Sequence, residues 1–279
     1  MTVGVVGLGL IGASICKAYK ENCKEAVVYG ADLDQSIVRI AEISGVIDGE
    51  LTEERIGCCD LVLVAIYPKA AIEWICRNGE RFSKNAIVMD CCGTKKQVCE
   101  ACFAKAREQG FLFVGGHPMA GSHNSGFKYA RANLFSGAPM VIVPPVFDDI
   151  QLLSRVKALL APLGFGKISV TDAEGHDRVI AFTSQMAHVV SNAYVKSPTA
   201  EQHKGFSAGS YKDLTRVAKL NATMWSELFL ENKDLLLKEL TNFKEHIDEY
   251  CKALEQGDGQ ELKRLLQEGS DLKERIDGR

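Results

Sequence analysis

The sequence predicts an α/β fold in which a doubly wound, parallel sheet is followed by an all-helical domain. Up to Pro145, short and almost wholly apolar runs alternate with helical patterns, as is typical of parallel strands covered by helices on both faces. After Pro145, apolar residues recur mainly every three to four positions, which indicates helices. The chain has 279 residues, and domains usually contain about 100 to 200 residues, so two domains are expected.

The expected strands are short runs rich in β-branched residues. They cover residues 2–6, 26–29, 61–66, 86–89, 111–114 and 140–143, with one further run at 167–170. The first helical pattern, at residues 11–20, directly follows the first strand. Because Pro144 and Pro145 mark the change of pattern, we expect one domain over residues 1–147 and a second over residues 148–279.

The second half is expected to be mostly helical. Asp172 is a suitable N-cap for a long helix to residue 196, and Pro198 would end it. Further helical patterns cover residues 212–220, 222–240, 241–255 and 260–276. Residues 224–240 are apolar on more than one face, which predicts that a partner chain covers this segment.

Composition and charge exclude several classes of protein. Hydrophobic residues make up 46% and charged residues 25%, and the formal net charge is −3, so binding to nucleic acid or to a membrane surface is not expected. The N-terminus has no signal peptide and no apolar run near 18 residues, which favours a cytoplasmic protein. The ten cysteines are expected to be reduced thiols, and their spacing predicts no metal site.

A glycine-rich string lies between the first strand and the first helix. Gly7, Gly9 and Gly12 form the pattern GxGxxG. Gly7 allows a tight turn, Gly9 allows a pyrophosphate to approach the backbone, and Gly12 allows close packing of helix on strand. The helical pattern then begins at Ile11, and the free N–H groups at this N-terminus face the same phosphates, so Leu10 and Ile11 are also expected to contact the cofactor. This pattern predicts a dinucleotide-binding Rossmann unit, with S-adenosylmethionine as the rival cofactor.

Asp32 extends the fingerprint, since it ends the second strand twenty residues after Gly12. A carboxylate there accepts both ribose hydroxyls and repels a 2′-phosphate, and no arginine follows it directly, so NAD is favoured over NADP. Further cofactor contacts are expected from Ala65 and Tyr67, at and just after the end of the third strand, and from Gly93 after the fourth.

A histidine lies at the carboxyl end of another strand. His117 is part of the string GGHPMAGS at residues 115–122, and ligands of open α/β sheets bind at that edge. A histidine can accept a hydroxyl proton while hydride leaves the same carbon, because its pKa is near neutrality. The alternative is a turn histidine that is hydrogen-bonded to backbone groups.

Three strings in this order resemble the prephenate and arogenate dehydrogenase family of tyrosine biosynthesis. Along the chain they are DCCGTK at residues 90–95, GGHPMAGS at residues 115–122 and KDLTRVA at residues 212–218. Residues 221–233 are similar to the helical dimerisation domain of that family. The resemblance covers nearly the whole chain and implies a homodimer formed through a helical domain that also binds substrate.

The resemblance also implies a reaction, the NAD-dependent oxidative decarboxylation of prephenate to 4-hydroxyphenylpyruvate. His117 would take the ring hydroxyl proton while hydride passes to the nicotinamide and carbon dioxide is lost. Arg216 corresponds to an arginine that binds a substrate carboxylate, a role that suits its planar guanidinium. His188 and Ser122 correspond to residues that line the substrate pocket.

The sequence departs from the family pattern at two positions. Gln185 replaces the first histidine of a string that resembles SHLPH, and Gly93 stands where a serine commonly bonds the catalytic histidine. The partner that orients His117 is therefore open, with water, Thr94 or the cofactor as candidates. Alternatives to a prephenate dehydrogenase are an arogenate dehydrogenase, a β-hydroxyacid or phosphogluconate type dehydrogenase, which usually relies on a helix lysine, and a non-catalytic NAD sensor.

Overall fold

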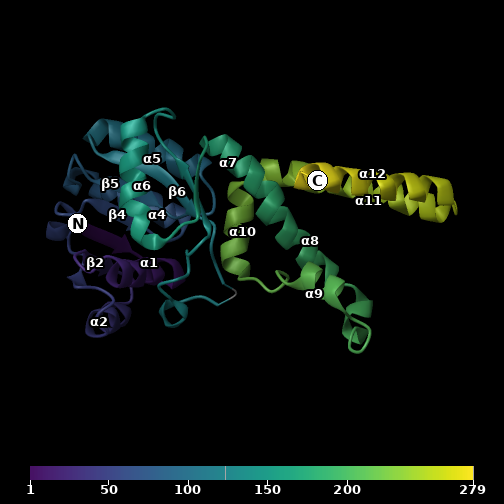
Figure 1. Ribbon diagram of the computed structural model, residues 1–279, viewed down its shortest axis with the longest axis horizontal. Coiled ribbons are helices and arrows are strands. Elements are labelled where there is room, and N and C mark those ends of the chain that lie inside the picture. Colours follow the sequence, from purple (N-terminus) through teal and green to yellow (C-terminus); the bar gives the residue numbers. More distant parts are fainter. Residues whose placement is uncertain (123, 279) are drawn as a thin grey trace.

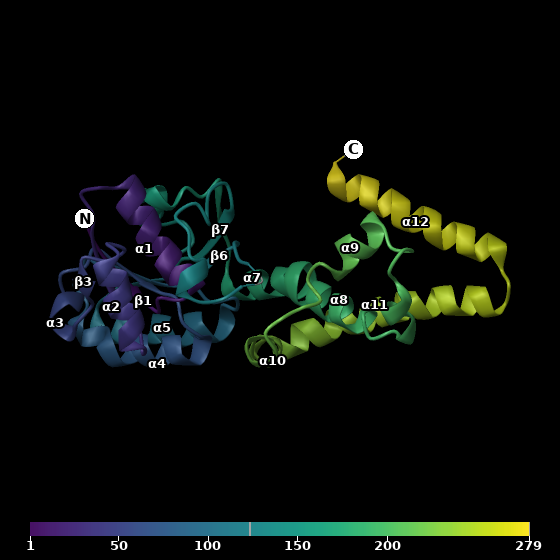
Figure 2. The ribbon, with the colours of Figure 1, turned by 90° about the horizontal axis from the view of Figure 1, so that it is seen from below.

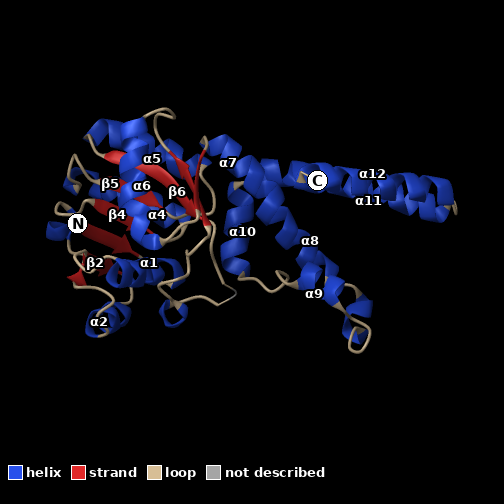
Figure 3. Cartoon of the chain, in the orientation of Figure 1, coloured by secondary structure: helices blue, strands red, loops and turns tan. Residues whose placement is uncertain are grey.

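The computed structural model describes residues 1–122 and 124–278, which form a sheet domain and a helical domain (Figure 1). In the described chain, eight strands form one sheet in the order β3-β2-β1-β4-β5-β6-β7-β8. Figure 3 shows the sheet on one side of the molecule and mainly helices and loops on the other. The strands are β1 (Thr2–Val6), β2 (Val27–Ala31), β3 (Gly49–Glu50), β4 (Leu61–Val64), β5 (Ile87–Asp90), β6 (Leu112–Pro118), β7 (Pro139–Val143) and β8 (Lys167–Val170).

Helices cover both faces of the sheet, as the apolar strand runs predicted. One hydrophobic core packs α1 (Leu10–Asn22), α2 (Gln35–Ile43) and α6 (Ile150–Leu160) on one face. The second core packs α3 (Glu53–Ile56), α4 (Pro68–Asn78) and α5 (Lys96–Gln109) on the other face. Figure 2 shows α1 on one side of the sheet and α4 and α5 on the opposite side. The doubly wound α/β fold is thus confirmed.

The far edge of the sheet differs from the all-parallel expectation. Strands β1 to β6 pair in parallel, but β7 pairs antiparallel with β6, and β8 is parallel to β7. In the described part of the connection between β6 and β7, the only helical element is the short 3₁₀ turn Phe127–Tyr129. An antiparallel neighbour does not need a crossover helix, whereas a parallel one does. The strand β3 was not predicted, because two residues carry no periodic signal.

The boundary that the sequence suggested after residue 147 needs revision. Helix α6 packs on the sheet and β8 pairs with β7, although both follow that boundary. Pro144 and Pro145 therefore end one strand, and the sheet domain continues beyond them. We propose a domain boundary between Val170 and Ala173, where α7 begins.

Carboxylate and amide side chains cap the helices of the second domain. Asp172 accepts a hydrogen bond from the N–H of Gly175 at 2.7 Å, which confirms the predicted N-cap. Asn221 and Asp258 cap later helices in the same way. The helices of this domain are α7 (Ala173–Ile180), α8 (Ala187–Tyr194), α9 (Gly209–Thr215), α10 (Ala222–Glu231), α11 (Lys233–Glu255) and α12 (Gly259–Asp277), with a π-helical segment, Ala181–Met186, that joins α7 to α8.

The predicted helices at 222–240 and 241–255 were divided at the wrong place. The chain breaks at Asn232, and α11 then continues through residue 241. Asn232 is buried, and its Nδ2 donates to the carbonyl of Asp177 at 2.9 Å and to Gln185 Oε1 at 2.8 Å. These tertiary hydrogen bonds hold the break, and no local sequence pattern reports them.

Helices α11 and α12 project away from the sheet domain (Figures 1 and 2). Several large apolar side chains of the helical domain are exposed, and Leu230 and Leu237, at 70% and 64% exposure, lie in the segment that was expected to meet a partner chain. The others include Val179, Phe182, Leu214, Ile247, Leu254, Leu266 and Ile276. The exposed apolar side chains of the helical domain thus include those of the segment for which the sequence predicted a partner chain.

Candidate active site

The glycine-rich turn has the geometry of a dinucleotide site. Gly7 has φ +87°, and a Cβ there would lie 2.6 Å from the carbonyl oxygen of Ala65. A Cβ at Gly12 would overlap with the carbonyl oxygen of Gly7. At Gly9, by contrast, an added Cβ would meet no atom within 4 Å. Gly7 and Gly12 are thus required by the fold, while Gly9 borders open space at the N-terminus of α1, where a phosphate fits.

Asp32 is fixed by backbone groups of this turn. Its Oδ2 accepts the N–H of Leu8 at 2.7 Å, and its Oδ1 accepts the N–H of Asp34 at 3.0 Å. A carboxylate has about four acceptor positions, so capacity remains for ribose hydroxyls. The residues at this end of β1 and β2 therefore fit NAD.

The other expected cofactor contacts lie at the same carboxyl edge of the sheet. Ala65 is half-buried beside Gly7, and its N–H donates to Val6 O at 2.7 Å. Tyr67 is 50% exposed at the start of α4. Gly93 follows β5, and a Cβ there would lie 3.5 Å from Leu228 of α10. This edge of the sheet domain thus faces the helical domain.

His117 contacts the helical domain directly. It is the last residue but one of β6, and its Nδ1 lies 2.9 Å from Nε2 of His176 in α7. Thr94, one of the candidate partners, donates its hydroxyl to Glu231 Oε2 at 2.5 Å instead. His176 is therefore the side chain that contacts the His117 ring through Nδ1, a partner that the sequence analysis did not identify.

His176 is held in turn by its neighbour Asp177. The two side chains are buried, and Nδ1 of His176 lies 2.7 Å from Oδ1 of Asp177. The same carboxylate accepts the N–H groups of Lys95 at 2.7 Å and Lys96 at 2.9 Å, at the N-terminus of α5. A carboxylate is favourable there because the positive end of the helix dipole faces it.

The surroundings of His117 favour its neutral form. Burial lowers the pKa of His117 well below the usual range of a histidine, and His176 and Lys95 act in the same direction. A neutral imidazole has a free nitrogen lone pair and can accept a proton. The ring is therefore prepared to act as a base.

A buried ion pair supports the floor of the site. Lys95 and Asp90 are both fully buried and form an ion pair through Nζ and Oδ2. Burial alone would lower the pKa of Lys95, but the Asp90 carboxylate raises it above the usual range. Asp90 also accepts the N–H groups of Cys92 at 2.9 Å and Gly116 at 3.1 Å, so it joins the ends of β5 and β6. The Lys95 side chain is therefore committed to this ion pair.

The predicted substrate residues lie in two places. Ser122 is exposed in the loop after β6, and its Oγ accepts the N–H of Asn124 at 3.1 Å. In α8, Nδ1 of His188 lies 3.1 Å from the carbonyl oxygen of Val217. Val217 directly follows the exposed Arg216 in the sequence. The ring centroids of Trp225 and His188 are 3.9 Å apart.

The structure thus brings His188 to the backbone segment that carries Arg216. It does not bring Arg216 or Ser122 into contact with His117 among the residues it describes. Helix α9, which precedes Arg216, packs on α8 at the end that is farther from the sheet (Figure 1). The roles of these residues stay predictions.

Gln185, one of the departures from the family pattern, has a structural role. It is buried in the π-helical segment, where its Nε2 donates to the carbonyl of Leu228 at 3.0 Å and its Oε1 accepts from Asn232. The side chain therefore joins three helical segments of the domain. It holds α10 in the place where Leu228 meets Gly93.

Sequence reasoning missed His176, Asp177 and Glu231. Glu231 is half-buried, and burial, together with Glu227 and Asp177, raises its pKa, although the hydrogen bond from Thr94 opposes this. The only local signal was an adjacent histidine and aspartate in the first turns of a capped helix. That pattern does not reveal which strand the pair meets.

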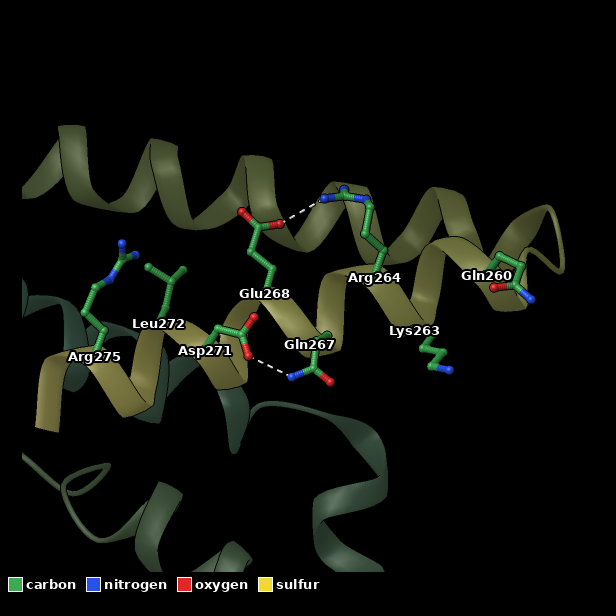
Figure 4. A pocket seen from close by; sticks show the side chains of 8 residues that line it. All are labelled: Gln260, Lys263, Arg264, Gln267, Glu268, Asp271, Leu272 and Arg275. Carbon is green, nitrogen blue, oxygen red and sulfur yellow. Dashed lines mark hydrogen bonds and ion pairs between the residues drawn. The ribbon is translucent and has the colours of Figure 1, made fainter. Parts of the chain in front are cut away.

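Other features of the described chain do not suggest a second reactive centre. Figure 4 shows a hollow lined by side chains of α12 alone, with Arg264 paired to Glu268 at 3.0 Å and no reactive cluster. Within residues 1–122 and 124–278, no cluster of histidine, cysteine and acidic side chains could hold a metal ion. No helix in the same part of the chain is long and apolar enough to cross a membrane.

Comparison with known proteins gives consistent matches over both domains. Residues 15–169 match the family model for the nucleotide-binding domain of prephenate dehydrogenase, and residues 172–268 match its dimerization domain. The prephenate dehydrogenase of Lactococcus lactis is 29% identical over 98% of this chain and 77% of its own length. That of Bacillus subtilis is 29% identical over 98% of this chain and 75% of its own length.

Solved structures agree with the sequence matches. Synechocystis arogenate dehydrogenase superposes with a TM-score of 0.83 at 25% identity, covering 99% of this chain and 100% of that one. The prephenate dehydrogenase of Aquifex aeolicus in complex with hydroxyphenyl propionate and NAD⁺ has a TM-score of 0.81 at 26% identity, covering 99% of this chain and 98% of that one. Together with the two domain matches, which span most of the sequence, these likenesses show that the chain belongs to the prephenate dehydrogenase family.

Proposed function

We propose that this protein catalyses the NAD-dependent oxidative decarboxylation of prephenate to 4-hydroxyphenylpyruvate, a step of tyrosine biosynthesis. The observation that carries the proposal is a neutral, oriented His117 at the same sheet edge as a complete dinucleotide turn. The two named relatives are prephenate dehydrogenases, which favours prephenate over arogenate.

The residues of the first domain have separate tasks in this reaction. NAD, when bound, supplies the hydride acceptor. Gly9 and the N–H groups of Leu10 and Ile11 hold the pyrophosphate, and Asp32 holds the ribose hydroxyls. Ala65, Tyr67 and Gly93 border the cofactor along the strand ends.

His117 performs the proton transfer. Its Nε2 takes the proton of the ring hydroxyl while the hydrogen on the same carbon leaves as hydride, and the carbonyl forms. The ring carboxylate is then lost as carbon dioxide, and the remaining electrons complete the aromatic ring. Aromatisation makes the step effectively irreversible. Arg216 is the proposed ligand of a substrate carboxylate, and His188 and Ser122 are proposed to line the pocket.

The helical domain is proposed to form a homodimer. The match to a dimerization domain and the exposed Leu230 and Leu237 support this assembly. Replacing Leu237 with Arg should therefore halve the mass measured by light scattering, because a charge cannot be buried without a partner. Ile43→Arg, at an 88% exposed site on α2, is the control and should keep the parent mass. A parent protein that is monomeric at assay concentrations would contradict the assembly.

Purified protein with NAD and prephenate should produce reduced cofactor, measured by its absorbance. His117→Asn should lower kcat by about 10² to 10⁴, the usual contribution of a positioned base. Because the pKa of His117 is lowered, protonation of His117 should reduce kcat/KM only at a pH below the ordinary histidine value of about 6.5. His246→Asn, at an exposed histidine of α11, is the control. No turnover with prephenate would refute the proposal, and turnover with arogenate alone would move it to the alternative substrate.

Gly9→Ala should impair NAD binding, whereas Gly12→Ala should impair the stability of the fold. A methyl group at Gly9 meets no protein atom, so the free energy of unfolding should change by no more than about 0.5 kcal/mol. NAD binding should nevertheless be lost, because the methyl group occupies the space of the phosphate. At Gly12 the methyl group overlaps the turn itself, so stability should fall by about 1 to 3 kcal/mol or more. Urea unfolding and NAD titration by calorimetry separate the two effects. Unchanged NAD affinity in Gly9→Ala would place the phosphates elsewhere.

Arg216→Ala should raise the KM for prephenate with little change in kcat. A hydrogen bond to a charged group contributes about 1.5 to 3 kcal/mol, which corresponds to a rise of about 10- to 150-fold. Lys212→Ala, at an exposed lysine in α9, is the matched control and should leave KM unchanged. An unchanged KM in Arg216→Ala removes this arginine from the substrate site.

A further inference from the structure

Three side chains form a line from the helical domain to the catalytic strand. Asp177 Oδ1 lies 2.7 Å from His176 Nδ1, and His176 Nε2 lies 2.9 Å from His117 Nδ1. His176 and Asp177 are 3% and 2% exposed, so water does not compete for these hydrogen bonds. The first two residues belong to α7 and the third to β6, which means that the line crosses between the domains.

The direction of the hydrogen bonds follows from Asp177. Its Oδ1 accepts the N–H of Lys95 and its Oδ2 accepts the N–H of Lys96. A backbone N–H can only donate, and an ionised carboxylate can only accept. The proton between Asp177 and His176 therefore belongs to Nδ1 of His176.

The tautomer of His176 then determines that of His117. A neutral imidazole that carries its proton on Nδ1 has an acceptor at Nε2. His117 must therefore donate from its own Nδ1, which leaves Nε2 of His117 without a proton. The reverse arrangement would place the proton on Nε2 of His117, and this nitrogen could not then accept a hydroxyl proton.

We propose that His176, held by Asp177, is the positioning residue that fixes His117 in the tautomer that can act as a base. The proposal rests on the proposed function for its kinetic consequence, but the tautomer itself is a property of the protein alone. It assigns to the helical domain a role in catalysis that does not involve contact with the substrate. It also explains how His117 is oriented although Gly93 offers no side chain.

A purely structural role of His176 is the rival explanation. Asp177 caps α5 and accepts two of its N–H groups, so this part of α7 also contributes to the contact between the domains. The experiment therefore needs readouts that domain packing alone would not change. Two substitutions at position 176 and one structural control provide them.

His176→Leu removes the acceptor with little change in volume, and His176→Gln supplies a carbonyl oxygen near the place of Nε2. With NAD and prephenate, we expect kcat to fall by about 10²-fold in the Leu variant with an unchanged KM, because His176 does not touch substrate. The Gln variant should recover to within about 10-fold of the parent. Equal kcat in the Leu variant and the parent would overturn the proposal, as would a Gln variant no faster than the Leu variant.

Asn232→Leu is the structural control. It removes buried hydrogen bonds to Asp177 O and to Gln185, outside the line of three side chains. It should lower the midpoint of thermal unfolding while kcat stays within a few-fold of the parent. A loss of kcat equal to that of His176→Leu would assign the effect to domain packing and overturn the proposal.

The tautomer is measured directly by NMR of the ¹⁵N-histidine-labelled full chain, with and without NAD. In the parent, His117 should show a protonated Nδ1 and an unprotonated Nε2, with the His117→Asn spectrum providing the assignment. In His176→Leu the proton should move to Nε2, the commoner site in a free neutral imidazole. A parent spectrum with the proton on Nε2 would overturn the proposal. Because this measurement needs no turnover, its result is independent of whether prephenate is the substrate.

Discussion

The carboxylate of Asp177 is the interaction on which the arrangement of the two domains depends. It belongs to the first helix of the helical domain, yet it accepts the N–H groups of Lys95 and Lys96 at the start of α5 and the ring N–H of His176. Each buried donor left without an acceptor would cost about 1 to 3 kcal/mol. The carbonyl of the same residue accepts from Asn232, so the break between α10 and α11 is tied to the same point. One short segment of α7 thus fixes the position of both the sheet edge and the later helices.

The buried ion pair of Lys95 and Asp90 beneath the site is connected to this contact. Lys95 donates its backbone N–H to Asp177 and uses its side chain to neutralise Asp90, which in turn joins β5 to β6. A buried ion pair seldom adds much net stability, because both charges lose their hydration. It does define the geometry of the strand end next to His117. It also places a positive charge where it disfavours a protonated imidazole.

The orientation of the base does not require a hydroxyl side chain at position 93. A Cβ at Gly93 would meet Leu228 at an ordinary contact distance of 3.5 Å, so packing alone does not demand glycine. Here the partner of His117 comes from α7, and α10 covers the end of β5 through Leu228. Gln185 holds that part of α10 through a hydrogen bond to the carbonyl of Leu228. The two departures from the family pattern, Gly93 and Gln185, therefore contribute to the same contact between the domains.

The sequence by itself determined the features that depend on local pattern. Apolar strand runs predicted a doubly wound sheet, the spacing of Gly7, Gly9 and Gly12 with Asp32 predicted the NAD-binding turn, and Asp172 predicted the start of α7. The tertiary structure decided the features that depend on contacts between distant segments. These are the antiparallel β7, the extension of the sheet domain to β8, the helix break at Asn232 and the partner of His117. A capping or periodic signal reports only neighbours along the chain, whereas 59 residues separate His117 from His176, and only the folded chain brings the two rings together.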